Sequence, residues 1–413
     1  MVSKIWREWR FPVEFALLLA LAFFLPLREA PKNLFWLAYV VVWVVNRVRS
    51  REWGGRWDGW DTLILLWLGS GYLAALFAGI RTPEGNEWGA VNDLVRYLTL
   101  LFCIKRGGYD EKQKAFLLTM LATSCVLAGA EAWWNWKISH ARKALELVSV
   151  GHVNHSAIYL SICAGLVSGL AFAFWAWLGW RGRGALAVAQ VLLLSWIFMT
   201  DSRAAVLAVL LLVVALVAIG GRAMGAGRLR WGAAALVIGI ALAIGGWGGV
   251  VRQVEHAAKN NMLAERDLIW NRALVAVAAN PWFGVGMDNF SRITDERLQG
   301  WVAASGKPYV ANDYRRAPHA HSLYLNTFAE RGSVGLGVVL LMLVLWGLLL
   351  ARRFESMRQG AALAVWCASF SGWFVTVLIG TVNTTLHHEH AMLALMTLGL
   401  LLAARPPDKP EAS

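Results

Sequence analysis

Long apolar runs separated by short polar segments make up most of this chain. Apolar runs of about 16 to 25 residues are long enough to cross the hydrocarbon core of a bilayer as α-helices. The pattern predicts twelve such spans, at residues 12–27, 33–47, 61–80, 88–104, 115–136, 153–179, 185–200, 204–220, 232–249, 322–350, 361–380 and 388–403. The fold class that we expect is therefore an all-α polytopic membrane protein.

Basic residues divide unevenly between the loops on the two sides of these predicted spans. With the N-terminus inside, the cytoplasmic segments carry three times as many Lys and Arg residues as the short loops on the opposite side. Cytoplasmic loops of membrane proteins keep such an excess of basic residues. The distribution predicts a multi-pass protein of an inner-type membrane with both termini in the cytoplasm.

One long polar loop divides the chain into three predicted units. Residues 1–249 form an N-terminal bundle of about nine spans, residues 250–321 form a loop domain outside the membrane, and residues 322–413 form about three spans and a short cytoplasmic tail. Within the loop, 263–280 (LAERDLIWNRALVAVAAN) has the pattern of an amphipathic helix that ends at Asn280 and Pro281. Loops of this length in compact proteins are usually functional.

The composition agrees with lipid as the solvent and excludes other classes. Hydrophobic residues make up 58% of the chain, charged residues 16%, and the mean hydropathy is +0.51. The net charge is +13, but the basic residues lie in short loops rather than along one soluble face, which argues against nucleic-acid binding. All four cysteines fall inside predicted spans, so neither a disulfide framework nor a cysteine zinc site follows.

Two arginines at the outer ends of predicted elements are candidates for binding a charged ligand. Arg203 lies in the turn MTDSRAA, and Arg266 lies at the start of the predicted loop helix. Two guanidinium groups that converge on an outward cavity suit a diphosphate, because they bind phosphate oxygens bidentately and stay protonated. The alternative is that both side chains only reach lipid headgroup phosphates. Their spacing leaves both interpretations open.

His321 directly precedes the predicted span at residues 322–350, which places its imidazole at a helix N-terminus. The helix dipole there disfavours a second proton on the ring, and a neutral imidazole can act as a general base. A histidine at a helix start is otherwise a cap or an interfacial polar residue. Position alone does not separate these roles.

Two further histidine clusters suggest metal sites, and three isolated charged residues suggest a transport path. GHVNHSAIY places His152 and His155 three residues apart, and HHEH at 387–390 does the same for His387 and His390, but neither has the HExxH order of a zinc protease. The sequence predicts no metal site at either. Glu14, Arg96 and Glu131 are scattered without inverted repeats, so burial beside local partners is expected rather than a transport path.

His321 and Ser322, followed by nine residues and then Gly332 and Gly335 in a GxxG pattern, form a motif. With it, the sequence resembles the O-antigen ligase and O-antigen polymerase superfamily. Three other segments look like further blocks of that family: RDLIWNRALVAVAANPWFGVGMDNF at 266–290, the DSR turn at 201–203, and GHVNHSAIYL at 151–160. The resemblance covers residues 151–337.

The resemblance implies a GT-C-like membrane glycosyltransferase of the bacterial inner membrane with an active site that faces the periplasm. It would take a glycan from undecaprenyl pyrophosphate and attach it to the lipid A-core, with inversion at the anomeric carbon and without metal or cofactor. His321 would be the general base, and Arg203 and Arg266 would bind the donor pyrophosphate. Weaker candidates are His319, His155, Arg331, Arg272, Tyr314 and Arg315.

Several functions compete with a ligase. An O-antigen polymerase of the same superfamily shares the motif, and so does a protein O-oligosaccharyltransferase, although the ending RPPDKPEAS without a long soluble domain disfavours the latter. An anion transporter is the alternative from another class, which the outward clustering of basic residues argues against. The expected partners are the lipid-linked glycan donor, the lipid A-core acceptor and membrane lipids, with no nucleic acid.

Overall fold

In the computed structural model, α-helices and short 3₁₀ turns are the only regular elements of the residues described here, which are 12–81, 87–200, 202–224, 236–244, 246, 265–357 and 359–403. The helices are α2 (Val13–Phe24), α3 (Glu29–Ser50), α4 (Gly59–Leu76), α5 (Glu87–Lys105), α6 (Glu111–Lys137), α7 (Val153–Phe174), α8 (Trp180–Met199), α9 (Arg203–Met224), α12 (Arg266–Ala279), α13 (Asp295–Ala304), α14 (Leu323–Arg353), α15 (Gly360–Ile379) and α16 (His388–Ala403). The 3₁₀ turns are Phe290–Arg292, Ala311–Asp313 and Glu355–Met357.

The predicted spans coincide with helices wherever the structure describes them. The ninth span is helical over residues 236–244 and has a turn at Gly246, and its other residues, like residues 250–264 and the tail from 404, lie outside the described residues. Among the described residues, six helices are long and apolar enough to cross a membrane, namely α4, α6, α7, α8, α14 and α15, and α2, α16 and part of α9 are shorter apolar helices. The described part of the chain is thus all-helical, as in a multi-pass membrane protein. The count of twelve spans and the boundary at 249–250 stay predictions.

Helix α7 lies at the centre of the bundle. In its apolar window 78% of the residues are buried, more than in any other candidate span. Its most extensive neighbour is α15, and it also packs on α6, α8, α9 and α16. Gly165 and Gly169, spaced as GxxxG, face α15 so closely that an added Cβ would meet Ser371 and Cys367. Small residues at this spacing let two backbones approach within a membrane.

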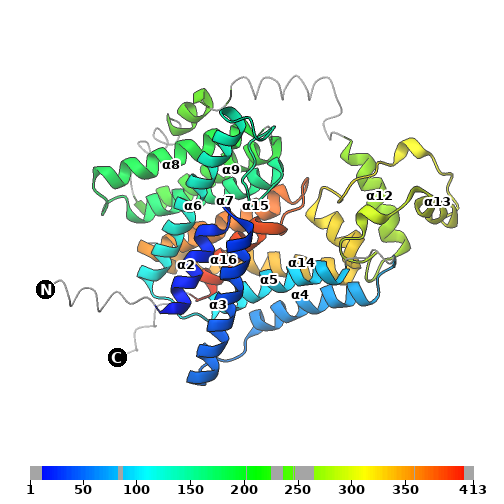
Figure 1. Cartoon of the computed structure of the whole chain (residues 1–413), viewed down its shortest axis with the longest axis horizontal. Helices are drawn as coiled ribbons and strands as arrows, with labels where there is room; N and C mark the ends of the chain where they lie inside the picture. Colours follow the sequence, from blue (N-terminus) through cyan, green and yellow to red (C-terminus); the bar gives the residue numbers. More distant parts are fainter. Residues whose placement is uncertain are drawn as a thin grey trace.

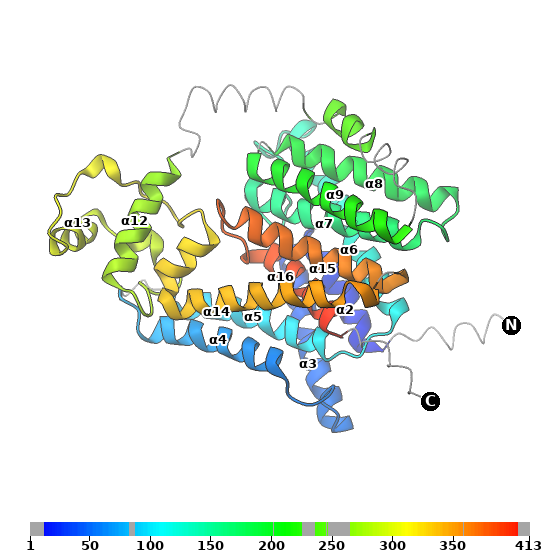
Figure 2. The same ribbon diagram turned by 180° about the vertical axis from the view of Figure 1, so that it is seen from behind.

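A separate small unit lies at one end of the molecule. Figures 1 and 2 show α4 and α14 side by side along the long axis, with α12 and α13 beyond their ends. This unit, which contains α12 and α13 and which we call the loop unit, has its own apolar core, which includes Ile269, Ala273, Phe290 and Leu298. The predicted amphipathic helix is confirmed, because α12 ends at Ala279 and is capped by Asn280. The loop unit can therefore present side chains from a rigid base.

A kink in α14 joins the loop unit to the bundle. Gly332 has φ 63° and ψ −168° inside the helix. The kink exposes backbone groups that segment 281–286 satisfies: the Val285 amide donates to the Ala329 carbonyl at 2.8 Å, and the Ser333 amide donates to the Pro281 carbonyl at 2.8 Å. Freed backbone groups at membrane depth must find such partners. The glycine motif after His321 thus has a structural role, which is to let the chain before the site dock onto α14.

Replacing Gly332 by alanine should disrupt this docking. Its φ favours glycine, and an added Cβ would lie 2.1 Å from the carbonyl oxygen of Trp282. A side chain forced into this backbone region costs about 1–3 kcal/mol before the steric clash is counted. Gly337→Ala is the matched control in the same helix, because nothing lies within 4 Å of its Cβ position. Thermal unfolding in detergent should show a clear drop for Gly332→Ala alone, and equal melting temperatures would contradict the role.

Charged side chains within the bundle have nearby partners. Glu14 binds Asn46 at 2.9 Å and Arg47 at 3.3 Å, and Glu131 binds Arg28 at 2.8 Å. Arg96 lies 3.5 Å from Asp93. The expected local partners of Glu14, Arg96 and Glu131 are therefore confirmed. A charge held in a pair is a poor step in an ion path, which weighs against the transporter alternative.

Candidate active site

His321 lies in the tight turn that leads into α14. Ser322 is the N-cap of this helix, and its hydroxyl oxygen accepts a bond from the Leu325 amide at 3.4 Å. His321 itself has φ 48°, in the left-handed region that non-glycine residues rarely occupy. Such backbone strain persists where surrounding contacts hold it, and it concentrates at functional sites. The turn therefore fixes the imidazole at a position that the chain would not adopt unaided.

Three contacts hold this turn in place. The Trp270 indole of α12 donates to the Ala320 carbonyl at 3.1 Å, and the Ala320 amide donates to the Asn326 side chain at 2.9 Å. The His321 amide donates to Nδ1 of His319 at 3.3 Å, which leaves Nε2 of His319 as the protonated nitrogen. The rings of His319 and His321 lie 4.2 Å apart. His319 is thus a positioning residue for His321.

The His321 imidazole is uncharged near neutral pH. Burial, and then the positive charge of Arg266 and the nearby His152, lower its pKa from 6.5 to about 4. Its Nδ1 atom is buried and has no hydrogen-bond partner in the part of the chain that the structure describes. Leaving a buried polar atom unpaired costs free energy, so an unpaired imidazole nitrogen in a native site calls for a functional explanation.

The two candidate arginines are brought together with this histidine. Arg203 is the first residue of α9, and Arg266 is the first residue of α12. Burial, and then the charge of Arg203, lower the pKa of Arg266, so the two guanidinium groups interact across 63 residues of sequence. Within the described residues, neither forms an ion pair with a carboxylate. Two neighbouring cations without a carboxylate partner among the described residues favour the binding of an anion.

Helix N-termini reinforce this positive potential. His152 caps α7, Arg203 begins α9, Arg266 begins α12, and His321 precedes the cap of α14. The charges of His152 and Arg266 both act on the pKa of His321, which places the ends of α7 and α12 near that of α14. Each helix N-terminus carries roughly half a positive charge and unpaired amides. The arrangement favours a ligand with several negative charges.

His155 belongs to a second group of histidines, which reaches the site through His319. Its ring lies 6.3 Å from that of His319, and 5.4 Å and 5.9 Å from those of His388 and His387. The fold thereby joins the two clusters that the sequence presented as separate motifs. His387, which directly precedes α16, and His388, the first residue of α16, are site residues that sequence reasoning did not assign. Only the fold brings α7 and α16 together.

A cavity of about 450 Å³ lies beside His319. Its walls come from α4, α5, α14 and the turn before α16. Polar groups in the lining include Asp93, Asn326 and Glu330, with His387 and His388 at one side. The lining is partly polar and partly apolar, and the cavity borders His319, His387 and His388.

The remaining arginine and tyrosine candidates have partners of their own, although Arg331 also lines the cavity beside His319. Arg331 bonds from α14 to the Trp67 carbonyl and the Ser70 hydroxyl of α4. Arg272 is buried and bonds Asp295 at 2.8 Å and the Ile293 carbonyl, which ties α12 to the following loop. The Tyr314 ring stacks on Tyr309, and Arg315 pairs with Glu265. These contacts indicate structural roles in the loop unit and its junction with the bundle.

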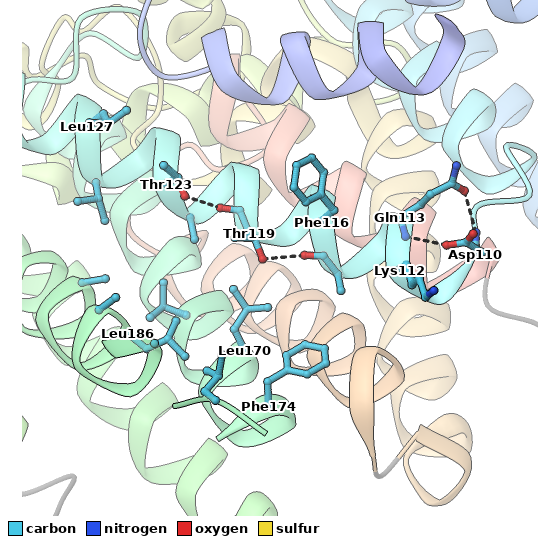
Figure 3. A pocket seen from close by; sticks show the side chains of 18 of the residues that line it. Asp110, Lys112, Gln113, Phe116, Thr119, Thr123, Leu127, Leu170, Phe174 and Leu186 are labelled. Atoms are coloured by element: carbon cyan, nitrogen blue, oxygen red, sulfur yellow. Dashed lines mark hydrogen bonds between the residues drawn. The ribbon is translucent and has the colours of Figure 1, made fainter. Parts of the chain in front are cut away.

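Another groove, lined mostly by apolar side chains, lies elsewhere in the bundle. It occupies about 1090 Å³ between the first half of α6, the second half of α7 and the start of α8. Figure 3 shows Phe116, Leu127, Leu170 and Phe174 along it, while the Thr119 and Thr123 hydroxyls are bonded within their own helix (Figure 3). Because His155 lies at the opposite end of α7, this groove is not where the histidines and arginines meet.

Comparison with known families identifies the region that contains most of this site. The model of a protein family described as O-Antigen ligase matches residues 188–340. The match includes Arg203, Arg266, His319 and His321 together with the kink at Gly332. No curated protein matches the chain.

Proposed function

Because the match over residues 188–340 identifies the chain as a member of the O-antigen ligase/polymerase superfamily, we propose that it is an O-antigen ligase. It would transfer a glycan from undecaprenyl pyrophosphate to the lipid A-core at the periplasmic face of the bacterial inner membrane. The observation that carries the proposal is the uncharged His321 imidazole, whose buried Nδ1 has no hydrogen-bond partner among the described residues. The positive charge of Arg266 acts on this ring, and Arg266 in turn interacts with Arg203.

The reaction needs few groups, because the diphosphate is already a good leaving group. His321 takes the proton of the acceptor hydroxyl as its oxygen attacks the anomeric carbon. The bond between that carbon and the pyrophosphate oxygen breaks, and undecaprenyl pyrophosphate leaves with the electron pair. Arg203 and Arg266 stabilise the charge that develops on the departing oxygens. Attack from the face opposite the leaving group inverts the anomeric carbon.

The pH dependence of transfer should show two different acidic limbs. In the free enzyme the pKa of His321 is about 4, so kcat/KM should fall only as the pH drops toward 4, where the base becomes protonated. A bound pyrophosphate is an opposite charge beside the imidazole, which raises its pKa. The acidic limb of kcat should therefore lie at higher pH than that of kcat/KM. Steady-state kinetics from pH 4 to 8 test this, and a kcat/KM limb at or above 6.5 would contradict it.

The acceptor distinguishes the ligase from its closest alternative. Deleting the gene in a strain that makes O antigen should leave lipid A-core without glycan, with O antigen accumulating on its lipid carrier. Loss of a polymerase would instead leave single repeat units on lipid A. A lipopolysaccharide gel of the deletion strain, with and without the restored gene, separates these outcomes. A ladder unchanged from that of the parent strain would reject both.

A further inference from the structure

Three imidazoles outside the proposed reaction centre lie close together. One atom from each of His155, His387 and His388 can be chosen so that all three lie within 4.8 Å of one another. The rings of His387 and His388 are 3.7 Å apart at a steep angle, and that of His388 is 5.4 Å from His155 at 84°. We propose that these three histidines form a binding site for one divalent transition-metal ion, with Zn²⁺ as the best fit.

The donor set suits this class of ion. Zn²⁺ binds imidazole nitrogens at about 2.0–2.1 Å, and sites with three protein ligands keep a fourth position open. Nitrogens around such an ion lie about 3.4 Å apart, so small side-chain rotations bring the three together. His387 and His388 also line the cavity of about 450 Å³, through which an ion can reach them and from which the fourth ligand can come.

A fourth histidine prepares His155 to be a ligand. Nδ1 of His155 lies 2.9 Å from Nε2 of His390, and the two rings are stacked at 16°. When Nδ1 of His155 donates its proton to His390, Nε2 of His155 carries a lone pair that is free for a metal. Metal-binding histidines commonly hold their second nitrogen in such a hydrogen bond, which fixes ring orientation and tautomer.

The turn that carries the other two ligands is held in a strained conformation. Leu386 has φ 56° and His388 has φ 49°, both in the left-handed region. The His388 amide donates to the Tyr97 hydroxyl at 2.9 Å, and the neighbouring Glu389 pairs with the buried Lys32. A strained turn that several contacts fix is typical of a site whose side chains must be aimed.

The spacing within each sequence motif gave no reason to expect this site. His152 with His155, and His387 with His390, are the pairs at helical spacing, whereas the ligands proposed here are one residue of α7 and two consecutive residues before and at the start of α16. All three lie outside residues 188–340, which the family model matches, although His155 lies within the segment 151–160 that resembles a family block. Its occupant would join α7 to α16 and would not enter the His321 step.

Cobalt binding tests the site without relying on transfer activity. The full chain, purified without a polyhistidine tag, should bind a single Co²⁺ and show the visible absorption bands of a tetrahedral site, which Zn²⁺ then abolishes. His388→Asn should weaken binding at least about 100-fold. His140→Asn is the matched control, because His140 also has a left-handed φ, of 54°, and asparagine tolerates this region.

Two outcomes would overturn the proposal. One is a folded wild-type protein that shows no tetrahedral cobalt spectrum, and the other is equal binding by His388→Asn and His140→Asn. If His388→Asn does not fold, His387→Asn makes the same comparison. Metal removal by EDTA should lower the melting temperature of the wild type and leave that of His388→Asn unchanged. Because these measurements report binding and stability, they stand apart from whether the protein is a ligase.

Discussion

Replacing His321 by asparagine is expected to reduce glycan transfer by about 10²- to 10⁴-fold, the range that a positioned general base contributes. Asparagine tolerates the left-handed φ of 48° at this position, so the variant removes the base without adding backbone strain. The acceptor hydroxyl then loses its proton acceptor, while the arginines still hold the donor. We therefore expect kcat to fall and the KM for the lipid-linked donor to change little.

The control for this variant is again His140→Asn, which has the same substitution at a similar φ outside the site. Both proteins should insert into the membrane and melt at similar temperatures. Transfer is measured with purified protein, lipid-linked glycan and lipid A-core. Near-normal transfer by His321→Asn would remove this residue as the base, and an equally large loss in His140→Asn would contradict a specific role of His321.

Replacing Arg266 by alanine should cost about 10²- to 10³-fold in kcat/KM, the loss typical of one preorganised charge-stabilising group. Arg266 is half-buried, and its charge acts on both Arg203 and His321, so no water-exposed cation can substitute for it. Arg266→Lys should recover only part of the activity, because an ammonium group lacks the planar fork that binds two phosphate oxygens. Arg203→Ala should act in the same direction.

Arg315→Ala provides the matched control for the arginine variants. Arg315 lies in the same loop unit but is exposed and pairs with Glu265, so its loss should leave donor binding nearly unchanged. Donor affinity measured at increasing salt concentration should fall less steeply in Arg266→Ala than in the wild type, because the wild type has more charge to screen. Equal donor affinity in Arg266→Ala and wild type would contradict the pyrophosphate role.

Most of the fold could be predicted from the apolar pattern, because lipid forces backbone polar groups into helices. A different rule predicted where α12 ends, because Asn280 and Pro281 interrupt its apolar spacing and are typical helix stop signals. The kink at Gly332 could not be predicted in this way. It depends on hydrogen bonds to residues 281–286, which lie some 50 positions earlier in the chain and approach only after folding.

The candidate site was predicted in part. His321, Arg203 and Arg266 were chosen because charged or polar groups at the outer ends of apolar helices need a reason, and the structure brings their charges together. Arg272 and Arg331 were weaker candidates, and they bond to Asp295 and Ser70 within the fold. The sequence shows which residues are charged but not which groups they bind in the folded protein. For the same reason it could not show that the histidines of α7 and α16 meet.

The most direct test of the account is transfer by the purified protein in liposomes, with undecaprenyl-pyrophosphate-linked glycan, lipid A-core and no nucleotide. The account predicts that glycan becomes joined to the acceptor as undecaprenyl pyrophosphate is released in equal amount, and that His321→Asn supports neither. A well-folded wild-type protein that joins no glycan to lipid A-core under these conditions would contradict it.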